Sequence, residues 1–144
     1  MLHGPCIILL SLGLLNVFPK LLRHHKPNIV KEAAWTLSNI TAGTTEQIQM
    51  VIDHGLVGDL INILQNGDFK SKKEATWAVT NLTSGGKPEQ VATLIELGVL
   101  EPLVQMLNCG DAKIVQVLNM GLYTQTLKHF KGDIGWHHEY SESR

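Results

Sequence analysis

The sequence has few of the residues that mark disulfide-bonded or nucleic-acid-binding proteins. Its 144 residues include two cysteines, Cys6 and Cys109, too few for a disulfide framework and not at metal-ligand spacing, so we expect a reducing compartment. Charged residues make up 17% of the chain, the net charge is -1, and like charges do not form long runs. A nucleic-acid-binding surface needs concentrated positive charge, so we expect no nucleic-acid partner.

Long apolar runs are also scarce. The run CIILLSLGLL at residues 6–15 is too short to span a bilayer, and it lacks the basic start and the small-residue cleavage site of a secretory signal. When it is shifted by 42 residues, Ile8 and Gly13 align with Met50 and Gly55. We therefore interpret the run as part of a truncated repeat, and we expect no membrane partner.

No set of residues indicates catalysis or metal binding. The chain has no phosphate-binding loop, and Ser38 and His54 belong to separate expected helices without a surrounding motif. The pairs His24-His25 and 137–138 lack further ligands at metal spacing. We therefore expect neither an enzyme nor a metal or cofactor site.

One segment occurs twice. KEAAWTLSNITAG begins at residue 31, and KEATWAVTNLTSG begins at residue 73, an offset of 42 residues. In a helix, one set of apolar positions in each copy has the spacing i, i+3, i+4, i+7, which is typical of a buried stripe. The stripe consists of Ala33, Thr36, Leu37 and Ile40 in the first copy and Ala75, Ala78, Val79 and Leu82 in the second.

A second stripe, rotated by about 100° from the first, combines a carboxylate, an indole and an amide. Its members are Glu32, Trp35 and Asn39 in the first copy and Glu74, Trp77 and Asn81 in the second. A single Trp off the core stripe most often packs under a loop or against the neighbouring repeat. Two identical triplets in the same register favour a binding function instead.

The middle unit reads as three helices separated by turns. We expect helices at 46–54, 56–65 and 68–83, with Gly55 ending the first at positive φ and Asp68 capping the third. In the first unit the second helix is expected at 14–24, with Pro19 kinking it or shifting its start, and Asn28 is expected to cap the third. Leu56, Leu60, Ile63 and Leu64 share one apolar face. In the last unit Pro102 falls near a helix start, where proline is tolerated.

The chain is expected to form an all-α array of two and a half to three such units. The units are 1–43, 44–85 and 86–130, and the tail 131–144 has no periodicity and is expected to be frayed or disordered. In the last unit Met120 and Thr124 replace the Trp and Asn, while Gly121 and Gln125 take core positions. The triplet stripe therefore ends after two units.

The two triplets predict a groove for an extended basic peptide. Equivalent helices of stacked repeats lie about 10 Å apart, so the two indoles can flank the aliphatic stem of Lys or Arg, with a cation–π attraction of about 0.5 to 2 kcal/mol. The Asn amides can hold a peptide main chain independently of its sequence. Glu32 and Glu74 can pair with the cationic side chains.

These motifs resemble importin-α, the armadillo-repeat adaptor for nuclear localisation signals. The resemblance covers most of residues 13–120 and is carried by KEAAWTLSNITAG, GDFKSKKEATWAVTNLTSGG and HGLV, which are similar to the seventh and eighth repeats, where the family has its minor signal-binding site. It implies an armadillo right-handed superhelix, nuclear localisation signal peptides as ligands, and a location in cytoplasm and nucleus. It implies importin-β binding only if the N-terminal binding segment is present elsewhere. The signal-contacting residues that it implies are Trp35, Ser38, Asn39, Glu74, Trp77 and Asn81.

Two alternatives remain. An armadillo scaffold of the β-catenin kind would bind acidic or other extended segments through a basic groove, and a truncated importin-α paralogue would have lost its function. The charge of the groove distinguishes the first alternative, because Glu32 and Glu74 stand beside the Trp and Asn residues while Lys31, Lys72 and Lys73 lie one or two positions away.

Overall fold

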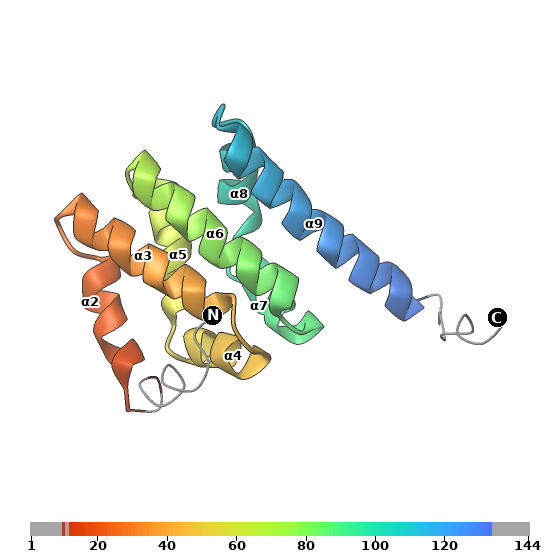
Figure 1. Ribbon diagram of the computed structural model, residues 1–144, viewed down its shortest axis with the longest axis horizontal. Helices are drawn as coiled ribbons and strands as arrows, with labels where there is room; N and C mark the ends of the chain where they lie inside the picture. The colour runs from red at the N-terminus through yellow and green to blue at the C-terminus, as the bar shows by residue number, and fades with distance from the viewer. Residues whose placement is uncertain (1–9, 11, 134–144) are drawn as a thin grey trace, which may run out of the picture.

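The computed structural model describes the backbone of residue 10 and of residues 12–133, and side chains as far as residue 123. This part of the chain is helical throughout, without a strand, which confirms the all-α prediction (Figure 1). The elements are η1 (Leu14–Val17), α2 (Phe18–Leu22), α3 (Pro27–Thr41), α4 (Thr45–Asp53), α5 (Leu56–Asn66), α6 (Phe69–Gly85), α7 (Pro88–Glu96), α8 (Leu100–Leu107) and α9 (Ala112–Asp133).

The longest helix of each unit belongs to one layer. In Figure 1, α3, α6 and α9 lie side by side in chain order, and the close contacts between α3 and α6 and between α6 and α9 agree with that view. The shorter helices α2, α5 and α8 pack against this layer, each against the long helix of its own unit. The arrangement is an armadillo superhelix, in which each unit is stabilised by its neighbours.

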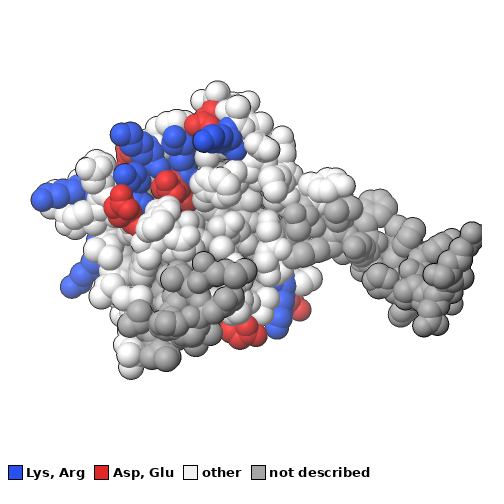
Figure 2. Space-filling view, viewed as in Figure 1, with Lys and Arg blue, Asp and Glu red and all other residues white. Residues whose placement is uncertain are grey.

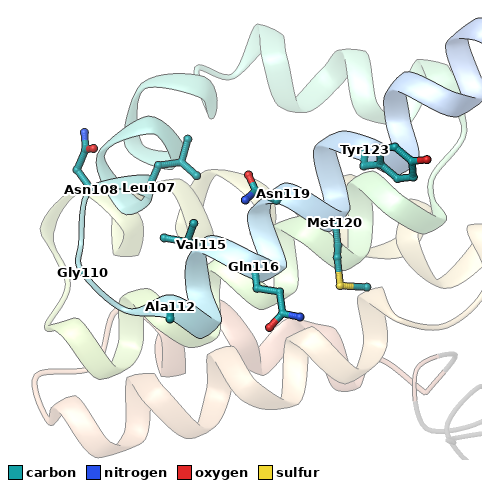
Figure 3. Close-up of a pocket in the computed structure, with 9 residues that line it drawn as sticks. All are labelled: Leu107, Asn108, Gly110, Ala112, Val115, Gln116, Asn119, Met120 and Tyr123. Carbon is teal, nitrogen blue, oxygen red and sulfur yellow. The ribbon is translucent and has the colours of Figure 1, made fainter.

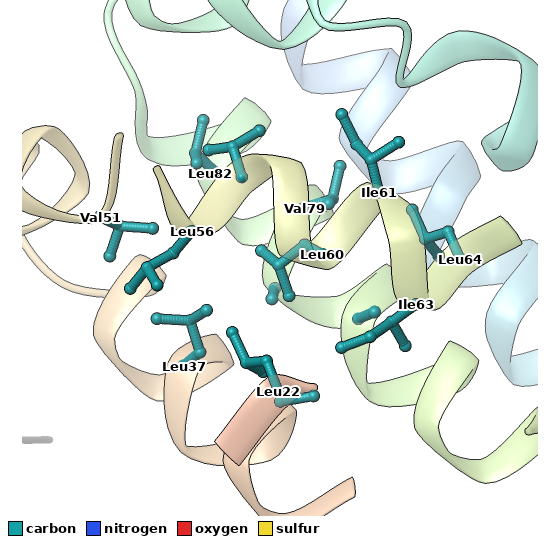
Figure 4. Packing of buried hydrophobic residues seen from close by; sticks show 14 of the residues in the cluster. Leu22, Leu37, Val51, Leu56, Leu60, Ile61, Ile63, Leu64, Val79 and Leu82 are labelled. Carbon is teal, nitrogen blue, oxygen red and sulfur yellow. The ribbon is translucent and has the colours of Figure 1, made fainter. Parts of the chain in front are cut away.

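The core lies between the two layers, where the repeated apolar stripe predicted it. Every member of the second copy is fully buried, and so are the four predicted residues of α5 (Figure 4). In the first copy Thr36 is the exception: it is only half-buried, and its hydroxyl donates to the Glu32 carbonyl at 2.8 Å. A Thr in a helix can satisfy its hydroxyl in this way at the edge of a core.

Pro19 divides the predicted helix at 14–24. Residues Leu14–Val17 form a turn of 3-10 helix, and the α-helix begins at Phe18 with Pro19 in its first turn. It ends at Leu22, two residues before the predicted end. The missing N–H and fixed φ of proline fit only the start of a helix, so the predicted shift of the start is confirmed.

The helix starts show one wrong prediction, one confirmed and one missed. Asn28 does not cap α3, because Pro27 takes the first helical position and moves the start two residues earlier, with Lys26 at the cap. Asp68 caps α6 as predicted, accepting from the N–H groups of Lys70 and Ser71. A capping box at α4, in which Thr44 and Gln47 exchange hydrogen bonds, was not predicted.

Further predictions concerned Gly55, the C-terminal tail and the apolar run. Gly55 has φ +69, as expected for a residue that ends one helix and starts another. The last helix, α9, runs to Asp133, three residues into the predicted tail, and the rest of the tail lies outside the described residues, as does half of the apolar run 6–15. Within the described part no single helix is long and apolar enough to cross a membrane, and the pair α7 and α8, which together reach that length and composition, is bent by 86°.

Replacing Asp68 with Ala tests the cap of α6. Hydrogen bonds from Ser71 hold the pKa of Asp68 below its ordinary range, so the ionised carboxylate stabilises the fold, and this contribution is lost as the pH falls through the lowered pKa. We expect Asp68→Ala to lower the free energy of unfolding by about 1 kcal/mol at neutral pH, measured by urea denaturation. Glu96→Ala removes an exposed carboxylate without a hydrogen bond or ion pair in the described structure from the last turn of α7, and it should cost nothing. Equal losses in both variants would contradict the role of the cap.

Candidate functional site

The two triplets lie on the neighbouring helices α3 and α6. Trp35 is 52% exposed and Trp77 is 42% exposed, although Leu37 and Val79 of the core stripe, two positions later in each copy, are fully buried. The helical spacing therefore placed both indoles correctly off the core. In Figure 1 the two helices run side by side, and the charge of Glu32 acts on Glu74 across them, so the two triplets lie close together.

The two asparagines differ in what they contact. The amide nitrogen Nδ2 of Asn81 donates to the Ser38 carbonyl of α3 at 3.0 Å and so links the two units. This leaves Asn81 one N–H and its carbonyl oxygen for a ligand. Asn39 is exposed, and its side chain has no hydrogen bond to the described residues. One amide is therefore held in place by the fold, and the other is open to solvent.

Ser38 lies beneath the triplets instead of among them. It is only 6% exposed, and its hydroxyl donates to the Trp35 carbonyl at 2.6 Å. Its own carbonyl accepts the hydrogen bond from Asn81. In this structure Ser38 positions two groups of the site, and direct contact with a ligand stays a prediction for this residue.

Charged side chains gather at one end of this surface. Figure 2 shows lysines and acidic residues over the starts of α3 and α6, whereas the middle of the same face carries other residue types. Lys31 pairs with Glu32, with 3.2 Å between Nζ and Oε1. Lys73 pairs with Asp111 at 3.6 Å and lies 5.3 Å from the centre of the Phe69 ring. Both lysines are thus engaged by groups of the chain itself.

Glu74 is the half-buried carboxylate of the site. Burial raises its pKa, the neighbouring Lys31 and Lys73 oppose the rise, and the negative charge of Glu32 adds to it. None of the ion pairs among the described residues includes Glu74. A raised pKa means that the folded state binds the proton more tightly than the unfolded chain, so ionised Glu74 costs stability at neutral pH. A cation placed beside it would relieve that cost.

Several side-chain links between the units were not predicted, among them those of Thr41 and Gln90. Thr41 donates its hydroxyl to the Ala78 carbonyl at 2.9 Å, and Gln90 donates to the Thr45 carbonyl at 3.0 Å. The recurrence of a Thr at 41 and 83 was a signal for the first; no local pattern indicated the second. In the part of the chain that the structure describes, no three His, Cys, Asp or Glu side chains come close enough to share a metal ion.

A known family model matches the chain in three successive segments. The model of the family described as Armadillo/beta-catenin-like repeat matches residues 4–42, 44–84 and 87–117. The chain is 44% identical over 102 residues to importin subunit alpha-5 of Arabidopsis thaliana, which covers 71% of this chain and 20% of that protein. It is 48% identical over 110 residues to importin subunit alpha-2 of the same plant, covering 76% and 20%. The chain belongs to the importin-α family of armadillo-repeat proteins.

This importin-α chain spans about one fifth of the length of these relatives. Its fold is also similar to solved designed armadillo repeat proteins. One, determined in complex with the peptide (KR)4, has a TM-score of 0.72 and 28% identity, covering 94% of this chain and 61% of that one. Another, designed for modular peptide recognition, has a TM-score of 0.76 and 29% identity, covering 87% and 55%.

The Asn pair provides a matched test of the link between the units. Asn81→Ala removes a half-buried hydrogen bond and leaves the Ser38 carbonyl without this donor, so we expect the free energy of unfolding to fall by about 1 kcal/mol. Asn39→Ala changes the equivalent residue, which is exposed, and should leave stability unchanged. Thermal and urea unfolding of both variants give the comparison, and an unchanged Asn81 variant would show that the link does not stabilise the fold.

Proposed function

We propose that this importin-α chain binds an extended Lys/Arg-rich peptide, of the kind that serves as a nuclear localisation signal, along α3 and α6. The observation that carries the proposal is the repeated triplet with its exposed indoles, in which two indoles and two amides stand in register on neighbouring helices. The chain would then act as part of an adaptor for nuclear import, in cytoplasm and nucleus.

The indoles select the long cationic side chains. Packed helices lie about 8 to 10 Å apart, so the gap between Trp35 and Trp77 suits a methylene chain with an indole on each side. Dispersion along the methylenes and cation–π attraction at the charged end favour Lys and Arg over shorter side chains. The large exposed fraction of both indoles supports this role, since burying them against a ligand removes apolar surface from water.

The asparagines hold the main chain of the peptide. A carboxamide offers one acceptor and two donors, which matches the alternating C=O and N–H groups of an extended peptide. Asn81 is oriented in advance by its bond to the Ser38 carbonyl, so little side-chain entropy is lost when a ligand binds. Ser38 therefore contributes by positioning.

The charges favour a basic ligand over an acidic one. The two nearest lysines are engaged by Glu32 and Asp111, while Glu74 is half-buried and has no ion pair in the described structure. A cationic side chain would stabilise that carboxylate, and an acidic peptide would not. A similar fold that was solved with the peptide (KR)4 gives further support.

The resemblance of the repeated motifs supports a more specific proposal for this groove. The two triplets resemble the seventh and eighth repeats of importin-α, so we propose that the ligand is bound as at the minor signal-binding site. Importin-β would join the complex only if its binding segment is present elsewhere. A titration with fluorescent Lys/Arg-rich and Asp/Glu-rich peptides tests the proposal, and preference for the acidic peptide would favour the scaffold of the β-catenin kind.

Trp77→Ala is expected to weaken binding of the basic peptide by about 1 to 3 kcal/mol, because one wall of the gap and its cation–π contact are lost. Fluorescence anisotropy measures the affinity, and circular dichroism checks the fold. Phe69→Ala is the matched control, because it removes another exposed aromatic ring from the same helix outside the triplet. A Trp77 variant that binds as tightly as the parent would assign the indole a structural role only.

Glu74→Gln is expected to reduce affinity for peptides with Lys or Arg over the site and to spare the matching Lys→Met peptide. The loss should shrink in high salt, which screens charge. Protonation has the same effect as the substitution, so the parent should lose affinity as the pH falls through the raised pKa of Glu74, and the variant should lose less. Equal losses of affinity for both peptides, independent of salt and pH, would show that Glu74 does not bind the cationic side chain.

A further inference from the structure

The end of the array formed by α8 and α9 exposes apolar side chains that the preceding unit buries. Three of these residues and their equivalents, 43 positions earlier, are Leu100, Val104 and Leu122, and Val57, Ile61 and Val79. Ile61 is 6% exposed, whereas Val104 at the same repeat position is 56% exposed. The other two pairs show the same contrast. We call the three exposed residues, with Asn119 and Tyr123, the C-terminal end face.

The repeat itself shows what covers such a face. In the middle unit the equivalent residues are buried where α8 packs against α5 and α9 against α6. The end face also contains two hollows. One, of about 500 Å³, is lined by residues of α6 to α9, including Val104 and Leu122. The other, of about 830 Å³, lies along α8 and α9 between Leu107 and Tyr123 (Figure 3).

The long helix α9 shows the same contrast, with exposed residues whose equivalents on α6 are buried. Asn119 and Tyr123 are exposed and line the hollow in Figure 3. Their equivalents on α6, Thr76 and Thr80, are buried where α9 lies beside α6. The surface of α9 thus has the place in the stack at which a further long helix would pack.

The opposite end of the array shows the complementary contrast. Leu14 is 38% exposed, although Leu56 at the same repeat position is fully buried against the preceding unit. Val17 is 49% exposed, and Asp59 at its equivalent position is buried. We call Leu14 and Val17, with the half-buried Leu21, the N-terminal end face.

We propose that two copies of this chain stack head to tail, with the N-terminal end face of one copy on the C-terminal end face of the other. The contact would continue the packing that already joins the units within one copy. Both faces expose apolar residues at the positions that the internal junctions bury, so association removes this surface from water.

The charges at the junction agree with the proposal. Between the first and second units, Arg23 pairs with buried Asp59 at 2.7 Å. At a junction between copies the equivalent positions are held by Asn108 and Val17. No ionised group at these positions would be buried without its partner, a situation that costs several kcal/mol.

A head-to-tail contact is heterologous, because it joins two different faces. The first and the last copy of a stack therefore each keep one free face. The assembly is therefore open and grows with protein concentration. A contact between two identical faces would instead stop at a dimer. Variants that place a charge on one end face at a time distinguish the head-to-tail contact from a contact between identical faces.

The test uses Val104→Glu and Val17→Glu, which change exposed residues of opposite end faces and should leave the monomer folded. Sedimentation velocity of the parent should show species larger than a monomer that increase with concentration. Each variant alone should remain monomeric, because one of its faces is blocked. An equimolar mixture of the two should form a one-to-one heterodimer and nothing larger, because one intact face of each kind remains.

Gln105→Glu is the matched control. It adds the same charge to α8, but at a position whose equivalent in the middle unit, Asn62, stays exposed, so it should associate like the parent. Circular dichroism confirms the fold of each variant. A parent that is monomeric at every concentration, a mixture without heterodimer, or a Val17 variant that still associates would overturn head-to-tail stacking.

Discussion

The close packing of the long helices is the constraint on which the rest of the structure depends. The contact between α3 and α6 is made by small side chains such as Ala34 and Ala78, both fully buried. At the next contact a Cβ added to Gly121 would come within 2.7 Å of Thr80 Cγ2, so α9 approaches α6 too closely for any larger residue without a shift. Small residues bring the helices together, and this spacing sets the distance between the indoles above them.

The repeated register explains why most of the fold could be predicted from the sequence. Two copies of one pattern, 42 residues apart, placed Ala75 and Leu82 in the core and both indoles on the surface. The errors arose where a single residue overrides the pattern, as Pro27 does at the start of α3. The links between units were missed because they join residues far apart in sequence, 43 positions for Asn81 and Ser38.

The exposure of the two indoles could be predicted from the sequence, but the interactions of the candidate site residues could not. Helical spacing indicated that Glu74 shares a face with Trp77, but its raised pKa depends on burial and on Lys31 of the neighbouring helix. Likewise, the resemblance implied Ser38 as a contact residue, but the hydrogen bond from its hydroxyl to the Trp35 carbonyl could not be predicted from that resemblance. Such effects need the packed structure, because burial and partner distances between helices are not encoded in the spacing along one helix.

Stacking and peptide binding use the same layer of long helices, so one constrains the other. In a head-to-tail stack, α3 of the second copy would lie beside α9 of the first, and the surface that carries the triplets would continue across the junction. The triplets would not be evenly spaced, because α9 has Met120 where α3 and α6 have a Trp. A peptide that crosses the junction would therefore meet two pairs of indoles separated by one unit without an indole. Two basic clusters joined by a neutral segment would fit this surface better than one uninterrupted run, because each unit without an indole leaves a cationic side chain with neither a cation–π partner nor an indole against its methylenes.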